Sequence, residues 1–99
     1  MNRHIYRAYY AYDGPTAAAP QREEKSAEEV SRMLQLLADQ LSHVFGETAI
    51  VDVGLIVRDE RGFLSRRFTI DTSMPASTCH DVVAPCLDAL DLYGDRLSQ

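Results

Sequence analysis

A stripe of apolar residues at three- and four-residue spacing runs through the segment that follows Ser26. This spacing places one apolar face along an α-helix. Ser26, with Glu29 three residues later, can cap the start of that helix, and Gly46 suits the left-handed turn that ends helices. The pattern therefore predicts a helix over 27–45. Its buried face should carry Val30, Met33, Leu34, Leu37, Leu41, Val44 and Phe45.

Three other segments have patterns typical of β-strands. Residues 4–12 are rich in tyrosine and contain no residue that breaks a strand. Residues 49–58 alternate with period two, and so do residues 63–71. Between them, residues 59–62 form a turn in which Gly62 can adopt a positive φ angle. The second and third segments are therefore predicted to form a β-hairpin.

The C-terminal region has helical spacing with an interruption. Pro85 lies inside the pattern, where a proline removes one hydrogen bond and clashes with the preceding turn. One alternative is a kinked helix over about 78–93, and the other is a helix that begins near Pro85. We favour the kinked helix, because the apolar register continues on both sides of the proline. Gly94 ends the helix in either case.

These elements predict an α+β fold with the order β-α-β-β-α in a single domain over 1–99. Residues 13–25 are expected to be a mobile connection. Both helices should cover one face of a three-stranded, mostly antiparallel sheet, as a two-layer sandwich. This is a ferredoxin-like order that lacks the last strand. The similarity concerns element order only, and no family is recognised in these residues.

The amino-acid composition indicates a globular domain rather than a membrane protein. Hydrophobic residues make up 45% of the chain and charged residues 25%, which is typical of an ordinary soluble globular domain. No apolar run approaches the roughly 20 residues that cross a bilayer, and no signal-peptide stretch is present. We therefore expect a cytoplasmic protein without membrane contact. Cys79 and Cys86 would lie about 10 Å apart on one helix, beyond disulfide reach, so both are expected to be reduced thiols.

The net charge of −5 disfavours binding to nucleic acid, because phosphates would be repelled. Positive charge gathers in one place, with Arg58, Arg61, Arg66 and Arg67 around the predicted turn. Solvated charge is the simpler interpretation of this cluster, and a local anion contact is the alternative.

The first predicted strand carries aromatic residues on both sides. Tyr6, Tyr10 and Tyr12 lie on one side, and Ile5 and Tyr9 lie on the other. Because a two-layer fold buries only one side of its sheet, some of these tyrosines should be exposed or should contact a partner.

Tyrosine is enriched in protein interfaces, whereas stacking on nucleic-acid bases would also need surrounding positive charge, for which Arg3 and Arg7 give thin support. A protein partner or a homodimer is therefore the preferred hypothesis. The predicted partner-binding residues are Tyr6, Tyr10, Tyr12, Asp88, Asp91 and Asp95.

Catalytic and metal-binding patterns are weak. Cys79, His80 and Asp81 stand near a predicted helix start, where a thiol pKa is lowered, but no base is placed within reach by the sequence. The spacing of Cys79, His80 and Cys86 does not match zinc-ligand pairs. No glycine-rich phosphate loop is present. We therefore predict no catalytic, metal or cofactor-binding residues.

Two functional hypotheses remain. The first is a small acidic protein that binds another macromolecule as an inhibitor, immunity protein or adaptor. It could act as a charge mimic that blocks a basic site of a nucleic-acid-processing or defence complex. The second is a small enzyme or ligand-binding domain whose site involves Cys79 or a subunit interface.

Overall fold

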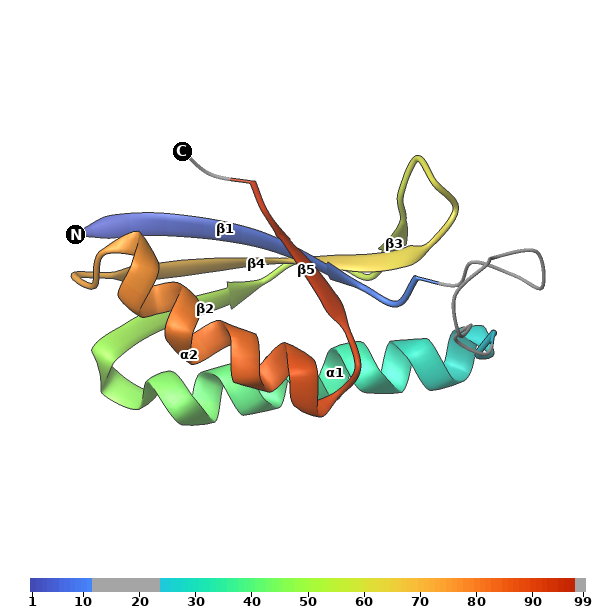
Figure 1. Cartoon of the computed structure of the whole chain (residues 1–99), viewed down its shortest axis with the longest axis horizontal. Helices are drawn as coiled ribbons and strands as arrows, with labels where there is room; N and C mark the ends of the chain where they lie inside the picture. Colours follow the sequence, from blue (N-terminus) through green and yellow to red (C-terminus); the bar gives the residue numbers. More distant parts are fainter. Residues whose placement is uncertain (12–23, 98–99) are drawn as a thin grey trace.

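The computed structural model describes residues 1–11 and 24–97. Figure 1 shows two layers, with the sheet above and both helices below it. In chain order the elements are β1 (Asn2–Tyr9), α1 (Ala27–Phe45), a 3₁₀ turn η1 (Gly46–Thr48), β2 (Ala49–Val53), β3 (Val57–Arg58), β4 (Leu64–Thr72), α2 (Ala76–Ala89) and β5 (Tyr93–Arg96).

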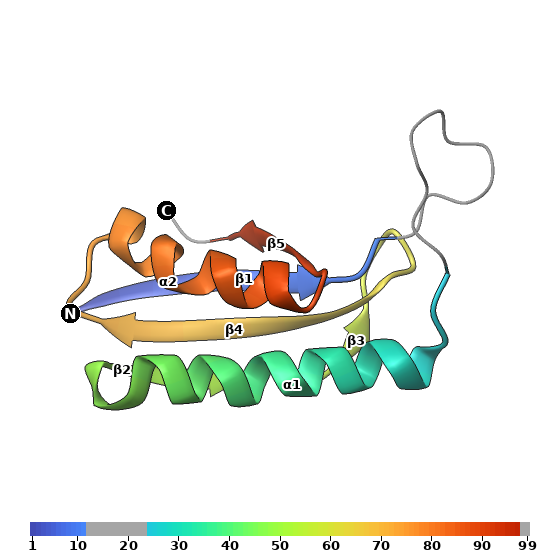
Figure 2. The same cartoon turned by 60° about the horizontal axis from the view of Figure 1, so that its bottom comes forward.

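The strands pair in the order β2-β4-β1-β5, and β3 pairs with β4 off this path. Every pairing is antiparallel. Because β1 and β2 are both antiparallel to β4, they run in the same direction, and α1 connects them. The longest ladder joins β1 to β4, from Asn2 opposite Thr72 to Tyr9 opposite Ser65. Figure 2 shows these two long strands running along the length of the sheet, with β1 passing behind α2 in this view.

The sheet differs from the predicted one. It has five strands rather than three, and the ferredoxin-like order that lacks its last strand is not confirmed. Residues 49–58 are divided into β2 and β3, because residues 54–56 leave the strand conformation.

The other added strand, β5, begins at Tyr93, where the second helix was predicted to end, and continues to Arg96. That helix ends at Ala89, and the Leu92 amide donates to the Leu87 carbonyl while Asp91 adopts φ 56°. The chain thus reverses and pairs with β1. Gly94 lets β5 pass close to α2, because a Cβ atom at this position would lie 2.5 Å from Leu87 Cδ1.

The helix predicted over 27–45 is confirmed as α1. Its first turn is capped by Ser26, whose Oγ accepts from the Glu29 amide at 3.2 Å. Gly46 follows the helix with φ 52°. Val44 was expected on the buried face, but it is 41% exposed, since Phe45 fills the buried position at this end of the helix.

The second helix continues on both sides of Pro85, as predicted, although it spans Ala76–Ala89 rather than 78–93. Within the described residues neither helix is long and apolar enough to cross a membrane. The predicted mobile connection over 13–25 lies outside the described residues, apart from Glu24 and Lys25.

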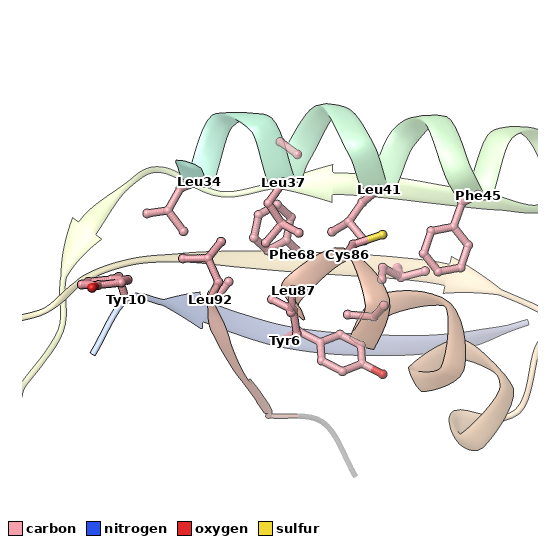
Figure 3. Close-up of a cluster of buried hydrophobic side chains, with 14 of the residues drawn as sticks. Tyr6, Tyr10, Leu34, Leu37, Leu41, Phe45, Phe68, Cys86, Leu87 and Leu92 are labelled. Atoms are coloured by element: carbon pink, nitrogen blue, oxygen red, sulfur yellow. The ribbon is translucent and has the colours of Figure 1, made fainter. Parts of the chain in front are cut away.

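The core lies between the sheet and the two helices (Figure 3). Strand β1 contributes Tyr6 and Ala8, Tyr10 follows directly after it, and β4 contributes Phe68 and Ile70. These side chains meet the apolar face of α1 and the inner face of α2. The helix residues in this core are Val30, Leu34, Leu37, Ala38, Leu41, Phe45, Cys79, Val83, Cys86 and Leu87.

Candidate functional site

The face of the sheet opposite the helices is the candidate site, and we call it the open face. Because Tyr6 and Ala8 point into the core, their neighbours along β1 point the other way. Figure 1 shows no helix of the described residues on this side. The central part of the open face comprises Arg3, Ile5, Arg7 and Tyr9 of β1, opposite Asp71, Thr69, Arg67 and Ser65 of β4.

Aromatic rings gather at one end of the open face. The Tyr9 ring stacks on Phe63 at 6.1 Å between centroids and contacts Tyr93 at 5.7 Å. The Arg61 guanidinium lies 4.1 Å from the centroid of the Tyr9 ring, within the range of a cation–π interaction. We call Tyr9, Phe63 and Tyr93 the aromatic cluster. It joins β1, the β3–β4 hairpin and β5.

Asp59 organises the hairpin that carries Phe63. Its carboxylate accepts from the backbone amides of Arg61 and Phe63, at 2.9 and 3.1 Å, and from the Arg61 guanidinium at 2.8 Å. Burial by itself would raise the pKa of the Asp59 carboxyl, but the hydrogen bonds from Arg61 and Phe63 outweigh it and lower the pKa. Asp59 is therefore ionised at neutral pH and holds Arg61 over Tyr9.

A network of ion pairs fastens the same hairpin to the sheet. Arg7 of β1 pairs with Glu60 at 3.3 Å and with Asp95 of β5 at 3.8 Å. Asp95 also pairs with Arg61 at 3.8 Å and accepts from the Tyr9 hydroxyl at 3.4 Å. Each exposed pair contributes little to stability. Together they fix the relative positions of the hairpin, β1 and β5.

A hollow of about 420 Å³ lies beside this network, and we call it the arginine hollow. Arg7 and Arg67 stand directly opposite each other in the β1–β4 ladder, and Arg58 completes a group of three guanidinium side chains. The lining residues are Arg7, Gly54, Leu55, Val57, Arg58, Asp59, Glu60, Ser65 and Arg67.

A second hollow, of about 590 Å³, lies between the start of α1 and the hairpin. Its rim includes Tyr10 and Glu24, which are close to the ends of the undescribed segment 12–23. Arg58 borders both hollows, so it stands at the boundary between them.

The large apolar side chains that remain exposed are concentrated on the open face and its edges. Eight are exposed in the described part of the chain, of which Leu36 and Val44 lie on α1 and Met1 precedes β1. Four of the remaining side chains lie opposite open-face residues of neighbouring strands. The fifth, Leu55, is in the β2–β3 connection. These five side chains are Ile50, Leu55, Val57, Tyr93 and Leu97.

Charge is divided unequally between the two sides of the molecule. The open face with the β3–β4 hairpin carries five arginines, balanced by the five acids Asp52, Asp59, Glu60, Asp71 and Asp95. The remaining described residues, mostly on the helix layer, carry eight acids and four basic residues. The negative charge of the described residues is therefore on the helix side, and the open face is nearly neutral.

The structure places the predicted partner residues in different surroundings. Tyr6 and Tyr10 are only 3% and 5% exposed, so the expectation that they lie at the surface is wrong. The helices cover the side of β1 that carries Tyr6, and Tyr10, directly after β1, belongs to the same core. Tyr9 is the tyrosine of β1 on the open-face side, where it is 9% exposed. Tyr12 lies outside the described residues.

The three predicted aspartates do not form one surface. Asp88 is exposed in the last turn of α2, and Asp91 is exposed in the turn that follows it. Asp95 is on the open face, where it pairs with Arg7 and Arg61.

Cys79 is fully buried, which bears on the hypothesis of a thiol enzyme. Burial raises the pKa of Cys79 and that of Cys86. Burial also raises the pKa of the neighbouring Tyr6 hydroxyl to about 12. A thiolate at Cys79 is therefore disfavoured at neutral pH, contrary to what a nucleophile requires. Within the described residues no group of three His, Cys, Asp or Glu side chains is placed to hold a metal ion.

Sequence reasoning missed the aromatic cluster, because its members come from three separate segments. The available signal was the alternation along β1, which already put Tyr9 on the side opposite Tyr6. The arginines around the turn were noticed as a group, but only the fold combines two of them with Arg7.

No family model matches the chain, and no curated protein matches it. Two solved structures resemble it: an amidase of the hydantoinase/carbamoylase family from Burkholderia multivorans, and a protein described as an amidohydrolase/peptidase from Burkholderia cenocepacia. They are 17% and 19% identical, each with a TM-score of 0.41. Each match covers 96% of this chain and 26% of the other. Similarity at this level carries no argument about activity.

Proposed function

We propose that this protein acts by binding another protein through the open face of its sheet, in the manner of an inhibitor, immunity protein or adaptor. The observation that carries the proposal is the concentration of exposed apolar side chains on this face and its edges. Exposed apolar and aromatic side chains gathered on one face, together with polar groups, are characteristic of protein–protein contact sites.

The aromatic cluster supports the same proposal. Tyr93 is 47% exposed, while Tyr9 beneath it is held between Phe63 and the Arg61 guanidinium. Aromatic residues that are already fixed lose little conformational entropy on binding, so more of their contact energy appears as affinity.

The charges favour a protein over nucleic acid as the occupant. Five arginines balanced by five acids give the open face no net positive charge to attract phosphates.

The same charges favour a different protein over a second copy of this chain. The acids of this face are already paired with its arginines, apart from Asp52. A second copy docked face to face would therefore offer almost no carboxylate to Arg58 and Arg67, which form no ion pair within the described part of the chain.

The acidic helix layer supports a second candidate, a charge mimic that blocks a basic site on its target. Eight acids against four basic residues on this side favour it. Asp88 and Asp91 would then be the contact residues. Neutralising them with Asp88→Asn and Asp91→Asn should slow association and flatten its salt dependence.

Capture of the partner from the native host with tagged variants tests the proposal. Leu55→Ser combined with Tyr93→Ala removes two exposed open-face side chains, and Leu36→Ser on α1 is the matched control. We expect the double variant to weaken capture by about tenfold or more, as loss of an aromatic anchor does. Leu36→Ser should capture like wild type. Equal capture by the double variant would exclude the open face, and loss with Leu36→Ser would move the contact to the helix layer.

A further inference from the structure

The arginines that line the arginine hollow carry more positive charge than the nearby carboxylates neutralise. Arg67 has no ion-pair partner among the residues that the structure describes, and Arg58 donates to the neutral Gly62 carbonyl at 2.8 Å. Arg7 is paired through its terminal nitrogens, yet its buried Nε has no acceptor in the described part of the chain. Guanidinium groups in this condition favour an incoming anion.

We infer that the arginine hollow is a carboxylate-binding site that takes an acidic side chain, with an apolar neighbour, from the peptide chain of a partner protein. This inference rests on the proposed function and names what the partner must present. The carboxylate would lie between Arg7, Arg58 and Arg67. The apolar neighbour would contact Leu55 and Val57, whose exposed side chains form the rim.

The lining selects a singly charged ligand. Three arginines are accompanied by Asp59 and Glu60, so the hollow carries about one uncompensated positive charge. A carboxylate matches that charge, whereas a doubly charged phosphate would also be repelled by the two acids. The volume of about 420 Å³ is within the usual range for small-ligand sites and holds one side chain with its neighbours.

The position of Arg67 opposite Arg7 gives a physical reason for an anion to bind in the arginine hollow. Arg67 faces Arg7 directly across the ladder, and like charges at opposed positions destabilise a sheet. Glu60 and Asp95 compensate Arg7, but neither makes an ion pair with Arg67. A carboxylate bridging both guanidinium groups removes this repulsion, and no internal side chain of the described residues does so.

The test uses a capped pentapeptide, acetyl-Ala-Leu-Glu-Leu-Ala-amide, and its Gln counterpart, titrated into isotope-labelled full-length protein by NMR. We expect the Glu peptide to shift the side-chain N–H signals of Arg7 and Arg67 and the amide signals of Gly54 and Leu55. The Gln peptide should bind about tenfold more weakly, as expected when a charge-assisted hydrogen bond is lost. Arg67→Gln should weaken the Glu peptide by a similar factor, while Arg32→Gln on α1 should not.

Three outcomes of the titration would overturn the inference. They are equal binding of the Glu and Gln peptides, tighter binding of inorganic phosphate than of the Glu peptide, and equal loss with Arg32→Gln and Arg67→Gln. Light scattering tests whether a second copy of this chain occupies the arginine hollow. If wild type dimerises and Arg67→Gln makes it a monomer, the site serves self-association and the partner peptide is excluded.

Partner capture separates this inference from the proposed function. If the Leu55→Ser and Tyr93→Ala double variant loses the partner but Arg67→Gln keeps it, the open face is the interface and the carboxylate site is wrong. If the peptide binds in a charge-dependent way but the double variant keeps the partner, the proposed function fails and the carboxylate site stands. If both the double variant and Arg67→Gln lose the partner, the result supports the proposed function and the carboxylate site together.

Discussion

At the scale of single residues, Asp59 connects the backbone of the hairpin to the candidate site. Its side chain is only 2% exposed, and it satisfies two backbone amides of its own turn as well as Arg61. This arrangement fixes the turn and at the same time places the Arg61 guanidinium over Tyr9. One carboxylate therefore links the backbone of the hairpin to the aromatic cluster.

Asp59→Asn should destabilise the protein by about 1 kcal/mol at neutral pH, because the amide is a weaker acceptor for Arg61 and that pair is partly screened by solvent. The folded pKa of Asp59 is below its ordinary value of 3.8. Its charge therefore stabilises the fold at pH values above 3.8, and this stabilisation is lost as the pH falls through the folded pKa.

Urea denaturation at several pH values measures this difference. The gap in unfolding free energy between wild type and Asp59→Asn should be constant near neutral pH and should shrink below pH 3.8. A gap that grows on acidification would contradict the assignment of a lowered pKa. Ser65→Ala, a buried open-face substitution without a titratable group, controls for general acid effects.

At the scale of elements, α1 shows how sharply its two faces differ. Leu37 is 1% exposed in the core, whereas its neighbour Leu36 is 49% exposed. The two residues have the same chemistry and adjacent positions in one helix. Only the direction in which they point relative to the sheet distinguishes their environments.

Leu37→Asp should abolish cooperative folding or reduce stability by several kcal/mol, because an unpaired carboxylate would be buried in the core. Leu36→Asp is the matched control and should change stability by no more than about 0.5 kcal/mol. Thermal unfolding followed by circular dichroism measures both. Cooperative melting of Leu37→Asp near the wild-type temperature would show that this stripe does not face the core.

At the scale of the whole molecule, the two layers differ in charge and in exposed apolar surface. The helix layer covers the core side of the sheet and bears most of the acidic side chains, while the open face is nearly neutral and holds most of the exposed apolar groups. Both cysteines lie in the interior that this arrangement creates. Their reactivity therefore reports on opening of the whole fold.

Alkylation by iodoacetamide at pH 7 should be at least about 100-fold slower in the folded protein than in urea-denatured chains, because both thiols must be exposed by unfolding. Burial also raises the pKa of each thiol, so the thiolate fraction at this pH is small. Mass spectrometry of Cys86→Ser isolates the rate at Cys79. Rapid labelling of Cys79 in the folded state would contradict this expectation and favour the thiol-enzyme hypothesis.

The sequence by itself determined the parts of the fold that depend on local interactions. Helix α1 has its cap at Ser26, its apolar spacing and its terminating Gly46 within one continuous segment, and each signal acts over a few residues. The continuation of α2 through Pro85 and the strand β4 followed from local periodicity in the same way. These elements needed no knowledge of distant partners.

The tertiary structure decided which surfaces are covered and which segments pair. Tyr93 keeps the helical register in the sequence, and it begins β5 only because residues 93–96 can pair with the edge of β1 beside α2. Alternation separated Tyr6 from Tyr9, but only the tertiary structure covers Tyr6 with the helices and covers Tyr9, on the open face, with Phe63, Tyr93 and Arg61. The arginine hollow depends on the register that sets Arg7 against Arg67, a pairing between strands about sixty residues apart. Long-range pairing of this kind is settled by the packing of the whole sheet, which no local pattern encodes.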